Sequence, residues 1–338
     1  MEFKLEKNKL EISLFKEVKQ IIEQSRLEVA KKVNSTLTAM YWQIGKKINE
    51  VILNNERAEY GKRTLKSLSI ELTREYGAGF NKSSLTRMIN FYNTFPNHEI
   101  VATLWQQLSW SHFRILITIK NDLERDFYTQ FCKLENWSVR TLKKKIDGML
   151  FTRTAISKKP DELIKNELQK LKDTGKLTPD LVFRDPYVLD FLNLKNMYSE
   201  KDLESSIIRE IESFILELGI GFTFVARQKR MIIDGLDFKL DLLFYHRKLK
   251  RLVAIELKLG KFKPQYKGQM ELYLRWLEKY EMEDGEEQPI GLILCAEGSK
   301  EQIELLQLDK SNIKVSEYIT QYLPKELLAK KLQQFIKD

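Results

Sequence analysis

The chain has 338 residues, of which 43% are hydrophobic and 31% charged, a composition that excludes a disordered or fibrous protein and allows two domains with separate cores. Lys and Arg number 57 against 48 Asp and Glu, so the formal net charge is +9. The charged first residues and the lack of an apolar run of membrane-spanning length predict a cytoplasmic protein with no signal peptide and no membrane partner.

Basic residues are concentrated in two parts of the chain. Residues 1–160 hold 28 Lys and Arg against 17 Asp and Glu, whereas the remainder holds 29 against 31. Within the remainder, residues 227–267 hold 12 basic and 4 acidic residues, which is typical of a surface that approaches phosphates. Cys132 and Cys295 lie among apolar neighbours without a second Cys or His at metal-binding spacing, which predicts buried thiols rather than a zinc site.

Helical periodicity runs through residues 10–150, where apolar residues recur at spacings of three and four. No strand-like alternation appears before about residue 221. Within this region, "TLKSLSIELTREYGAGFNKSSLTRMINFYNTF" predicts a helix, a turn at Gly77 and Gly79, and a second helix capped by Asn81 or Ser83. We therefore predict an all-α N-terminal domain over residues 1–150, with a local helix-turn-helix pattern.

A later helix repeats features of the second helix in this pattern. Residues 80–89 and 137–146 both show an aromatic residue, a polar cap, a hydroxyl side chain, Leu, a basic residue and Ile. Two such recognition helices would present basic side chains to DNA phosphates or base edges, although solvated faces of a helical bundle explain the same residues equally well. The candidate DNA-binding residues are Lys82, Arg87, Arg140, Lys143, Lys144 and Lys145.

Residues 151–182 are polar with prolines near both ends, and we predict a linker with one amphipathic helix there. The second domain is predicted over residues 183–325. Its first long helix spans residues 200–218 and stops at Gly219, and Glu204 lies on the apolar face of this helix. Such a carboxylate either belongs to a functional site or is stabilised by the helix dipole in the first turn.

The elements that follow predict the order α-β-β-β-α-β. Three strands with short turns at Asp234-Gly235 and "RKLK" precede a basic loop, a helix and a fourth strand. The ranges are 222–233, 238–246 and 251–259 for the three strands, 269–280 for the helix and 290–296 for the fourth strand. We therefore expect an α+β protein overall, in which the all-α domain precedes an α/β domain.

Two carboxylates and a lysine are expected to meet in this meander. The second and third strands are neighbours, so Asp241 can lie beside Glu256, and Lys258 emerges on the same face as Glu256 because side chains alternate along a strand. Carboxylates within largely apolar strands are costly unless they have partners. The trio therefore indicates a site.

These residue types suit the cleavage of a phosphodiester. Asp241 and Glu256 are hard oxygen ligands for Mg²⁺, with Mn²⁺ as the alternative, and Lys258 would hold or deprotonate the attacking water or neutralise developing charge. Gln269 and Tyr273 lie one helical turn apart and can reach the same cleft. Further candidate contacts to nucleic acid are Gln228 on the first strand and Lys261, Lys263 and Lys267 around the basic loop.

Each of these residues also has an ordinary structural explanation. A Glu-x-Lys pair on a strand is a common surface ion pair, and Gln269 and Tyr273 alone would be unremarkable helix residues. His246 stands beside Arg247 at a turn and is expected to be an exposed loop residue. The functional interpretation rests on the combination of order, spacing and topology.

The motifs as a set resemble those of the PD-(D/E)xK nuclease superfamily, and the Gln269…Tyr273 pair resembles its RecB-like branch. More narrowly, the chain resembles the YhcG-type bacterial proteins, which have a helical N-terminal domain and a C-terminal nuclease domain. The similarity runs through "MYWQIGKKI", "GFNKSSLTRMINFYNTFP", "LSWSHFRIL", "FRDPYVLDFLNL", "GFTFVARQ", "DLLFYHRKLKRLVAIELKLGKFKPQYKGQMELYL" and "VSEYI".

This resemblance implies a restriction-endonuclease-like fold, metal binding at Asp241 and Glu256, a catalytic Lys258 and an auxiliary, metal-facing carboxylate at Glu204. The chain departs from the family pattern at Glu271, where Asn is usual, and at residues 83–86, where arginine is more frequent. The second departure weakens the expectation that this helix reads DNA bases.

We therefore expect a metal-dependent deoxyribonuclease whose helical domain binds DNA or a partner. One alternative is an inactive DNA-binding or assembly protein that retains the nuclease fold, and another is a protein-interaction scaffold. A cut through both strands by one active site per chain would favour a homodimer.

Overall fold

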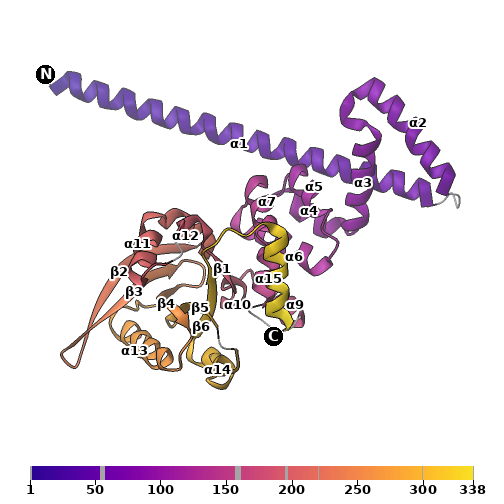
Figure 1. Cartoon of the computed structure of the whole chain (residues 1–338). Helices are drawn as coiled ribbons and strands as arrows, with labels where there is room; N and C mark the ends of the chain where they lie inside the picture. Colours follow the sequence, from indigo (N-terminus) through magenta and orange to yellow (C-terminus); the bar gives the residue numbers. More distant parts are fainter. Residues whose placement is uncertain are drawn as a thin grey trace. The chain divides into compact units, whose positions relative to one another are not determined.

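The computed structural model of the chain describes residues 2–53, 58–156, 161–194, 197–219, 221–298 and 300–337. The chain divides into two compact units, Met1–Lys143 and Lys144–Asp338 (Figure 1). No helix among the described residues is long and apolar enough to cross a membrane. The first unit is helical and the second contains a mixed sheet with helices, which confirms the predicted fold class.

Unit 1 is built from helices that pack around the C-terminal part of the first one. Its elements are α1 (Glu2–Leu53), α2 (Ala58–Tyr76), the 3₁₀ turn η1 (Ala78–Phe80), α3 (Lys82–Thr94), α4 (His98–Trp105), α5 (Trp110–Leu116), α6 (Asp122–Glu135) and the first residues of α7 (Val139–Asp147). Helix α1 approaches α3 at Gly45, where a Cβ atom would lie 2.0 Å from the carbonyl oxygen of Met88. Only glycine therefore fits this crossing.

The turn between α2 and α3 follows the local sequence signals. Gly77 adopts a φ of 90°, which favours glycine, and the Asn81 side chain caps α3 by accepting a hydrogen bond from the Ser84 amide at 2.9 Å. Of the two predicted caps, Asn81 and Ser83, the structure uses Asn81. Leu85, Met88 and Phe91 form the buried face of α3.

Unit 2 is a six-stranded mixed sheet with helices on both faces. Its helices are the end of α7, then α8 (Leu150–Ile156), α9 (Asp161–Thr174), α10 (Pro179–Val182), η2 (Asp190–Leu192), α11 (Glu200–Arg209), α12 (Ile211–Leu218), α13 (Gln265–Tyr280), α14 (Lys300–Leu305), η3 (Leu308–Ser311) and α15 (Lys325–Lys337). Its strands are β1 (Tyr187–Val188), β2 (Phe222–Ile233), β3 (Leu236–His246), β4 (Arg251–Lys261), β5 (Ile290–Glu297) and β6 (Ile313–Ile319).

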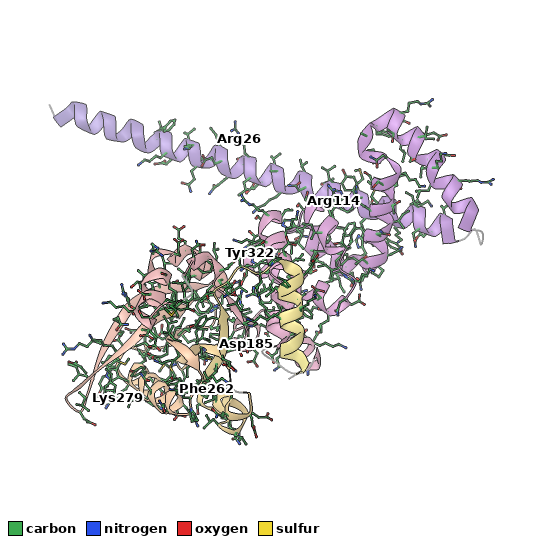
Figure 2. All side chains as sticks on the ribbon, in the orientation of Figure 1. Arg26, Arg114, Asp185, Phe262, Lys279 and Tyr322 are labelled. Carbon is green, nitrogen blue, oxygen red and sulfur yellow. The ribbon has the colours of Figure 1, made fainter. Side chains whose placement is uncertain are left out.

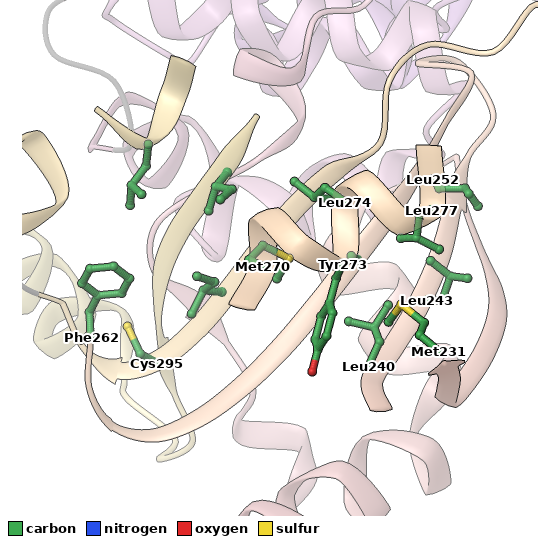
Figure 3. Packing of buried hydrophobic residues seen from close by; sticks show 14 residues of the cluster. Met231, Leu240, Leu243, Leu252, Phe262, Met270, Tyr273, Leu274, Leu277 and Cys295 are labelled. Carbon is green, nitrogen blue, oxygen red and sulfur yellow. The ribbon is translucent and has the colours of Figure 1, made fainter. Parts of the chain in front are cut away.

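The sheet has the order β1-β6-β5-β4-β3-β2, with β2, β3 and β4 antiparallel and the β4, β5, β6 and β1 pairs parallel. The predicted αβββαβ order is present, and β6 and β1 extend it. Alternating residues of β3 serve the two faces: Leu243 belongs to the core under α13, whereas Phe244 contacts Phe214 of α12 with ring centroids 5.9 Å apart. Figure 3 shows the α13 side of this core around Met270 and Leu277.

The helix predicted over residues 200–218 is broken at Glu210, whose φ of −104° and ψ of 34° separate α11 from α12, and no Pro or Gly marks that break. The prediction that His246 is an exposed loop residue is wrong. His246 is the last residue of β3, is fully buried and packs against Phe222. Residues 151–182 form α8, α9 and α10, with Leu168 buried, and the boundaries 1–150, 151–182 and 183–325 stay predictions.

Candidate active site

The ladder between β3 and β4 opens where the two predicted carboxylates lie. Its register runs from His246 opposite Arg251 to Leu242 opposite Ile255, and Asp241 and Glu256 follow at the open end. There the Oδ2 atom of Asp241 accepts a hydrogen bond from the Leu257 amide at 2.9 Å. The Asp241 carboxylate thus accepts the hydrogen bond that a backbone carbonyl of β3 would accept in a continuous ladder. This bond fixes the side chain against β4 at the point where the backbone pairing of the two strands ends.

Lys258 completes the trio on β4. Its Nζ atom lies 2.9 Å from Oε2 of Glu256, and its side chain is only 14% exposed. The ammonium group also lies 5.4 Å from the centre of the Tyr266 ring, within the range of a cation–π contact. Burial lowers the pKa of Lys258, but the charges of Glu256 and Asp241 outweigh burial and the pKa is raised, so Lys258 is a cation at neutral pH.

The two carboxylates repel each other in a poorly solvated position. Burial and then the negative charge of Asp241 raise the pKa of Glu256 to about 7, against the opposing effect of Lys258. Burial likewise raises the pKa of Asp241, although the Leu257 amide and Lys258 stabilise its ionised form. The single positive charge of Lys258 therefore does not offset the two negative charges of Asp241 and Glu256.

Glu204 joins the site through Gln228. Its side chain is 8% exposed, and its Oε2 atom accepts a hydrogen bond from Nε2 of Gln228 at 2.8 Å, while the same nitrogen donates to Oδ1 of Asp241 at 3.1 Å. The other Glu204 oxygen pairs with Nε of Arg227. Gln228 has a φ of 48°, an uncommon backbone conformation for a residue with a side chain. In this conformation its side-chain amide reaches the carboxylates of both Glu204 and Asp241.

Glu204 and the Asp241–Glu256 pair are thus separated by an amide bridge. Among the residues that the structure describes, no three His, Cys, Asp or Glu side chains are grouped closely enough to hold a metal ion together. Arg227, which sequence reasoning missed, is 40% exposed and stands next to Gln228. Its one sequence signal is its place within the basic stretch 227–267.

Gln269 and Tyr273 are joined by a hydrogen bond in the N-terminal half of α13. Gln269 donates to the Tyr273 hydroxyl at 2.8 Å, and that hydroxyl lies 3.5 Å from the carbonyl oxygen of Lys239. The Tyr273 ring belongs to the hydrophobic core, where Figure 3 shows its hydroxyl at the edge of the cluster. The pair borders β3 next to Asp241, and no described hydrogen bond joins it to Glu256 or Lys258.

Two further residues fix the end of β4 behind Lys258. The Tyr318 hydroxyl donates to the carbonyl oxygen of Lys258 at 3.2 Å, and Oε1 of Glu200 lies 3.4 Å from the amide of Leu259. Tyr318 lies in the quoted segment "VSEYI", but it was assigned no role because β6 was not predicted. Its contact lies 60 residues away along the chain.

The predicted lysines of the basic loop differ in their surroundings. Lys261 pairs with Glu297 at 2.8 Å, and Lys267 lies 3.5 Å from Glu271 and donates to the Leu306 carbonyl at 3.2 Å. Lys263 is exposed. Since acidic partners offset two of these three charges, Lys263 is the best placed of them for a phosphate.

The predicted basic residues of the helical region are mostly exposed. Lys82, Arg140, Lys143 and Lys144 are exposed and Arg87 is half-buried. Lys145 instead donates to the carbonyl oxygen of Leu216 at 2.7 Å, which satisfies an unpaired carbonyl at the C-terminus of α12. Lys145 thus has a structural contact within unit 2.

Replacing Glu256 by Gln should stabilise the protein at alkaline pH. Because the folded pKa of about 7 lies above the ordinary value of 4.5, ionisation of Glu256 costs folded-state stability as the pH rises through this window. We expect the unfolding free energy of the variant to rise relative to that of wild type by about 3 kcal/mol between pH 4.5 and pH 8.

Thermal unfolding of both proteins across that pH range measures this shift. Glu297→Gln is the matched control, because Glu297 is 58% exposed and its loss should leave the pH dependence nearly unchanged. A constant difference between wild type and the Glu256 variant from pH 4.5 to pH 8 would contradict the raised pKa.

Comparisons with known proteins identify a family domain in each part of the chain. Residues 180–333 match the YhcG PDDEXK nuclease domain and residues 17–153 match the DUF1016 N-terminal domain. The chain is 35% identical over 343 residues to the putative nuclease YhcG of Escherichia coli (strain K12), with 92% of this chain and 91% of that protein covered.

Two solved structures show weaker similarity. A repair endonuclease from Pyrococcus abyssi is 20% identical with a TM-score of 0.27, over 39% of this chain and 50% of that one. A complex of EndoMS with double-stranded DNA is 19% identical with a TM-score of 0.26, over 39% of this chain and 48% of that one. The extent of the sequence match to the Escherichia coli protein confirms the predicted resemblance, and the chain belongs to the YhcG family of nuclease-domain proteins.

Proposed function

We propose that this protein is a metal-dependent deoxyribonuclease that hydrolyses phosphodiester bonds at Asp241, Glu256 and Lys258. The observation that carries the proposal is the convergence of two buried carboxylates and a lysine at the open end of the β3–β4 ladder. The membership of a nuclease family supports the reaction class. An inactive protein is not favoured, because the three groups that the chemistry needs are together.

The donor set fits a hard divalent cation. Asp241 and Glu256 supply carboxylate oxygens of the kind that Mg²⁺ and Mn²⁺ bind, and the raised pKa values of both groups support a place for positive charge beside them. A bound divalent ion supplies polarisation of the scissile phosphate and acidification of water. Glu204 was predicted as a third metal ligand, but Arg227 and Gln228 already hold its two oxygens, which favours a positioning role for Glu204. Gln228 in turn orients the Asp241 carboxylate.

Lys258 acts as a charged donor in this proposal. Because its pKa is raised, Lys258 carries its proton at neutral pH, which favours holding the attacking water or neutralising developing negative charge over removing a proton. Its carbonyl is held by Tyr318, so the backbone that carries the ammonium group is fixed. Gln269 and Tyr273 border the site and would keep β3 and α13 in register near Asp241.

DNA binding is proposed for exposed basic residues of both units. Lys82, Arg140, Lys143 and Lys144 in the helical region and Lys263 beside the site are exposed and would contact phosphates. Arg227 is 40% exposed, but its charge is paired with Glu204, so it is not included in this set. A homodimer and a cytoplasmic location remain predictions.

A panel of labelled nucleic acids tests the function. Duplex, single-stranded and branched DNA and RNA are incubated with wild type or Asp241→Asn protein in Mg²⁺, in Mn²⁺ or in chelator. We expect DNA cleavage by wild type only, and only with a divalent ion. Binding of DNA without cleavage of any form in either ion would favour the inactive alternative.

Metal binding can be followed without cleavage. A ligand that binds only the folded protein raises the unfolding temperature, so Mg²⁺ or Mn²⁺ should raise it for wild type and not for Asp241→Asn. An unchanged wild-type unfolding temperature at millimolar metal would contradict the proposed donor set.

A further inference from the structure

The N-terminal part of α1 carries an apolar stripe without a partner in its own unit. Helix α1 has 52 residues, and its N-terminal part extends beyond the other helices of unit 1 (Figure 1). Each residue from 14 to 34 is exposed, whereas Thr38, Trp42 and Ile48 further along the helix are buried. Figure 2 shows the side chains around Arg26 standing clear of the rest of unit 1.

The exposed apolar side chains lie along one side of the helix. At 100° per residue, they fall within an arc of about 120°. The members of this stripe, with their exposed fractions, are Leu14 60%, Phe15 69%, Val18 45%, Ile21 63%, Ile22 46%, Val29 63% and Val33 52%. Leu27, at 56%, lies on the opposite side. Most neighbouring members of the stripe are three or four residues apart, which is the spacing of side chains that pack one helix against another.

The C-terminal part of α1 shows how an apolar face of this helix is covered. Further along α1, Tyr41, Ile44 and Ile48 pack against α3 residues in one core cluster. A helical segment of this length is marginal in water by itself, because most helix stability in proteins comes from packing an apolar face. An exposed apolar stripe of this length is therefore expected to pack against another helix.

The amount of apolar surface fits a pair of such helices. Burying a large aliphatic side chain removes on the order of 100 Å² of apolar surface, so the half-exposed stripe offers about 400 Å² per helix. A standard protein interface buries about 800 Å² per partner, of which a little over half is apolar. Two copies of the stripe would therefore form an interface of ordinary size.

The charges on the helix argue against nucleic acid or an anionic membrane as the occupant. Residues 14–37 contain five basic and three acidic residues, and Lys19 pairs with Glu23 at 3.7 Å on the flank of the stripe. A phosphate-binding or lipid-binding helix would have a predominantly basic polar face. A mixed polar face is typical of helices that pair with one another.

The sequence of the stripe favours antiparallel over parallel pairing of two copies of this helix. In an antiparallel pair Val18 lies opposite Val29, Leu14 opposite Val33, and the stem and ammonium group of Lys32 lie along the Phe15 ring. In a parallel pair, Lys32 would face Lys32 of the other copy in the seam, and like charges there are unfavourable. We propose that residues 14–37 of α1 pair in antiparallel orientation with the same segment of a second copy of this chain.

Sedimentation velocity of the full chain over a range of concentrations tests the proposal. We expect a dimer for wild type and a monomer for Ile22→Lys/Val29→Lys, with dimerisation weakened by at least ~100-fold because both lysines would enter the buried seam. Gln20→Lys/Leu27→Lys is the matched control, since it adds two lysines, also seven residues apart, to the opposite side of the same helix, and it should remain dimeric. Circular dichroism checks that each variant keeps its helix content.

A monomeric wild type at tens of micromolar would overturn the proposal, as would a stripe variant that dimerises like the control. The orientation is tested by disulfide formation between introduced cysteines, against a background of the buried Cys132 and Cys295. A mixture of Leu14→Cys and Val33→Cys proteins should form mixed disulfide dimers, and either variant alone should not. Cross-linking of each variant with itself, without mixed dimers, would exclude the antiparallel arrangement.

Discussion

Replacing Lys258 by Met should abolish DNA cleavage while DNA binding is retained. The methionine keeps the length of the side chain and removes the cation that lies 2.9 Å from Glu256. Loss of a group that stabilises developing charge or positions a proton typically lowers the rate by 10²–10⁴-fold, and we expect a fall of about 10³-fold. Single-turnover cleavage with Mg²⁺ and equilibrium DNA binding in metal-free buffer give the two readouts.

Binding should change by no more than about threefold, because Lys258 is held by Glu256 and is one charge among many on a basic protein. Lys279→Met is the matched control: Lys279 is exposed at the end of α13, and its loss should leave both rate and binding unchanged. A Lys258 variant that cleaves within tenfold of wild type would show that another group supports the reaction.

Replacing Glu217 by Gln should strongly destabilise unit 2. Glu217 pairs with Arg153, whose side chain is 3% exposed, and it also accepts a hydrogen bond from the Val188 amide at 2.9 Å. The variant would leave the buried guanidinium without its counter-charge, and breaking a buried pair in this way costs about 3–5 kcal/mol. Urea unfolding and hydrogen exchange in peptides of β5 and β6 measure the loss.

The pH dependence of wild-type stability gives a second test of the same pair. Burial would raise the pKa of Glu217, but Arg153 and Arg184 outweigh burial and the pKa is lowered. This contribution is therefore present above the ordinary carboxyl pKa and is lost as the pH falls through the lowered value. Glu212→Gln, on the exposed side of α12, should change stability by less than about 1 kcal/mol. Equal effects of the two substitutions would show that the Arg153 pair is not a major stabilising contact.

The sequence by itself determined the αβββαβ order and the trio on β3 and β4. Period-two alternation, glycine and asparagine at turns, and short loops are local signals, and adjacent antiparallel strands must place Asp241 near Glu256. Lys258 followed from the same alternation. The all-α region and the Asn81 cap were predicted for the same reason, because helix periodicity and capping act within a few residues.

Tertiary structure alone decided which groups surround the trio. Gln228 bridges Glu204 and Asp241, and Tyr318 holds the Lys258 carbonyl, through contacts between residues far apart in sequence. The burial of His246, the Arg153–Glu217 pair and the exposure of the α1 stripe depend in the same way on which elements pack together. Local propensity fixes the period and ends of an element, but burial, pKa values and free surfaces arise from neighbours that only the folded chain brings into contact.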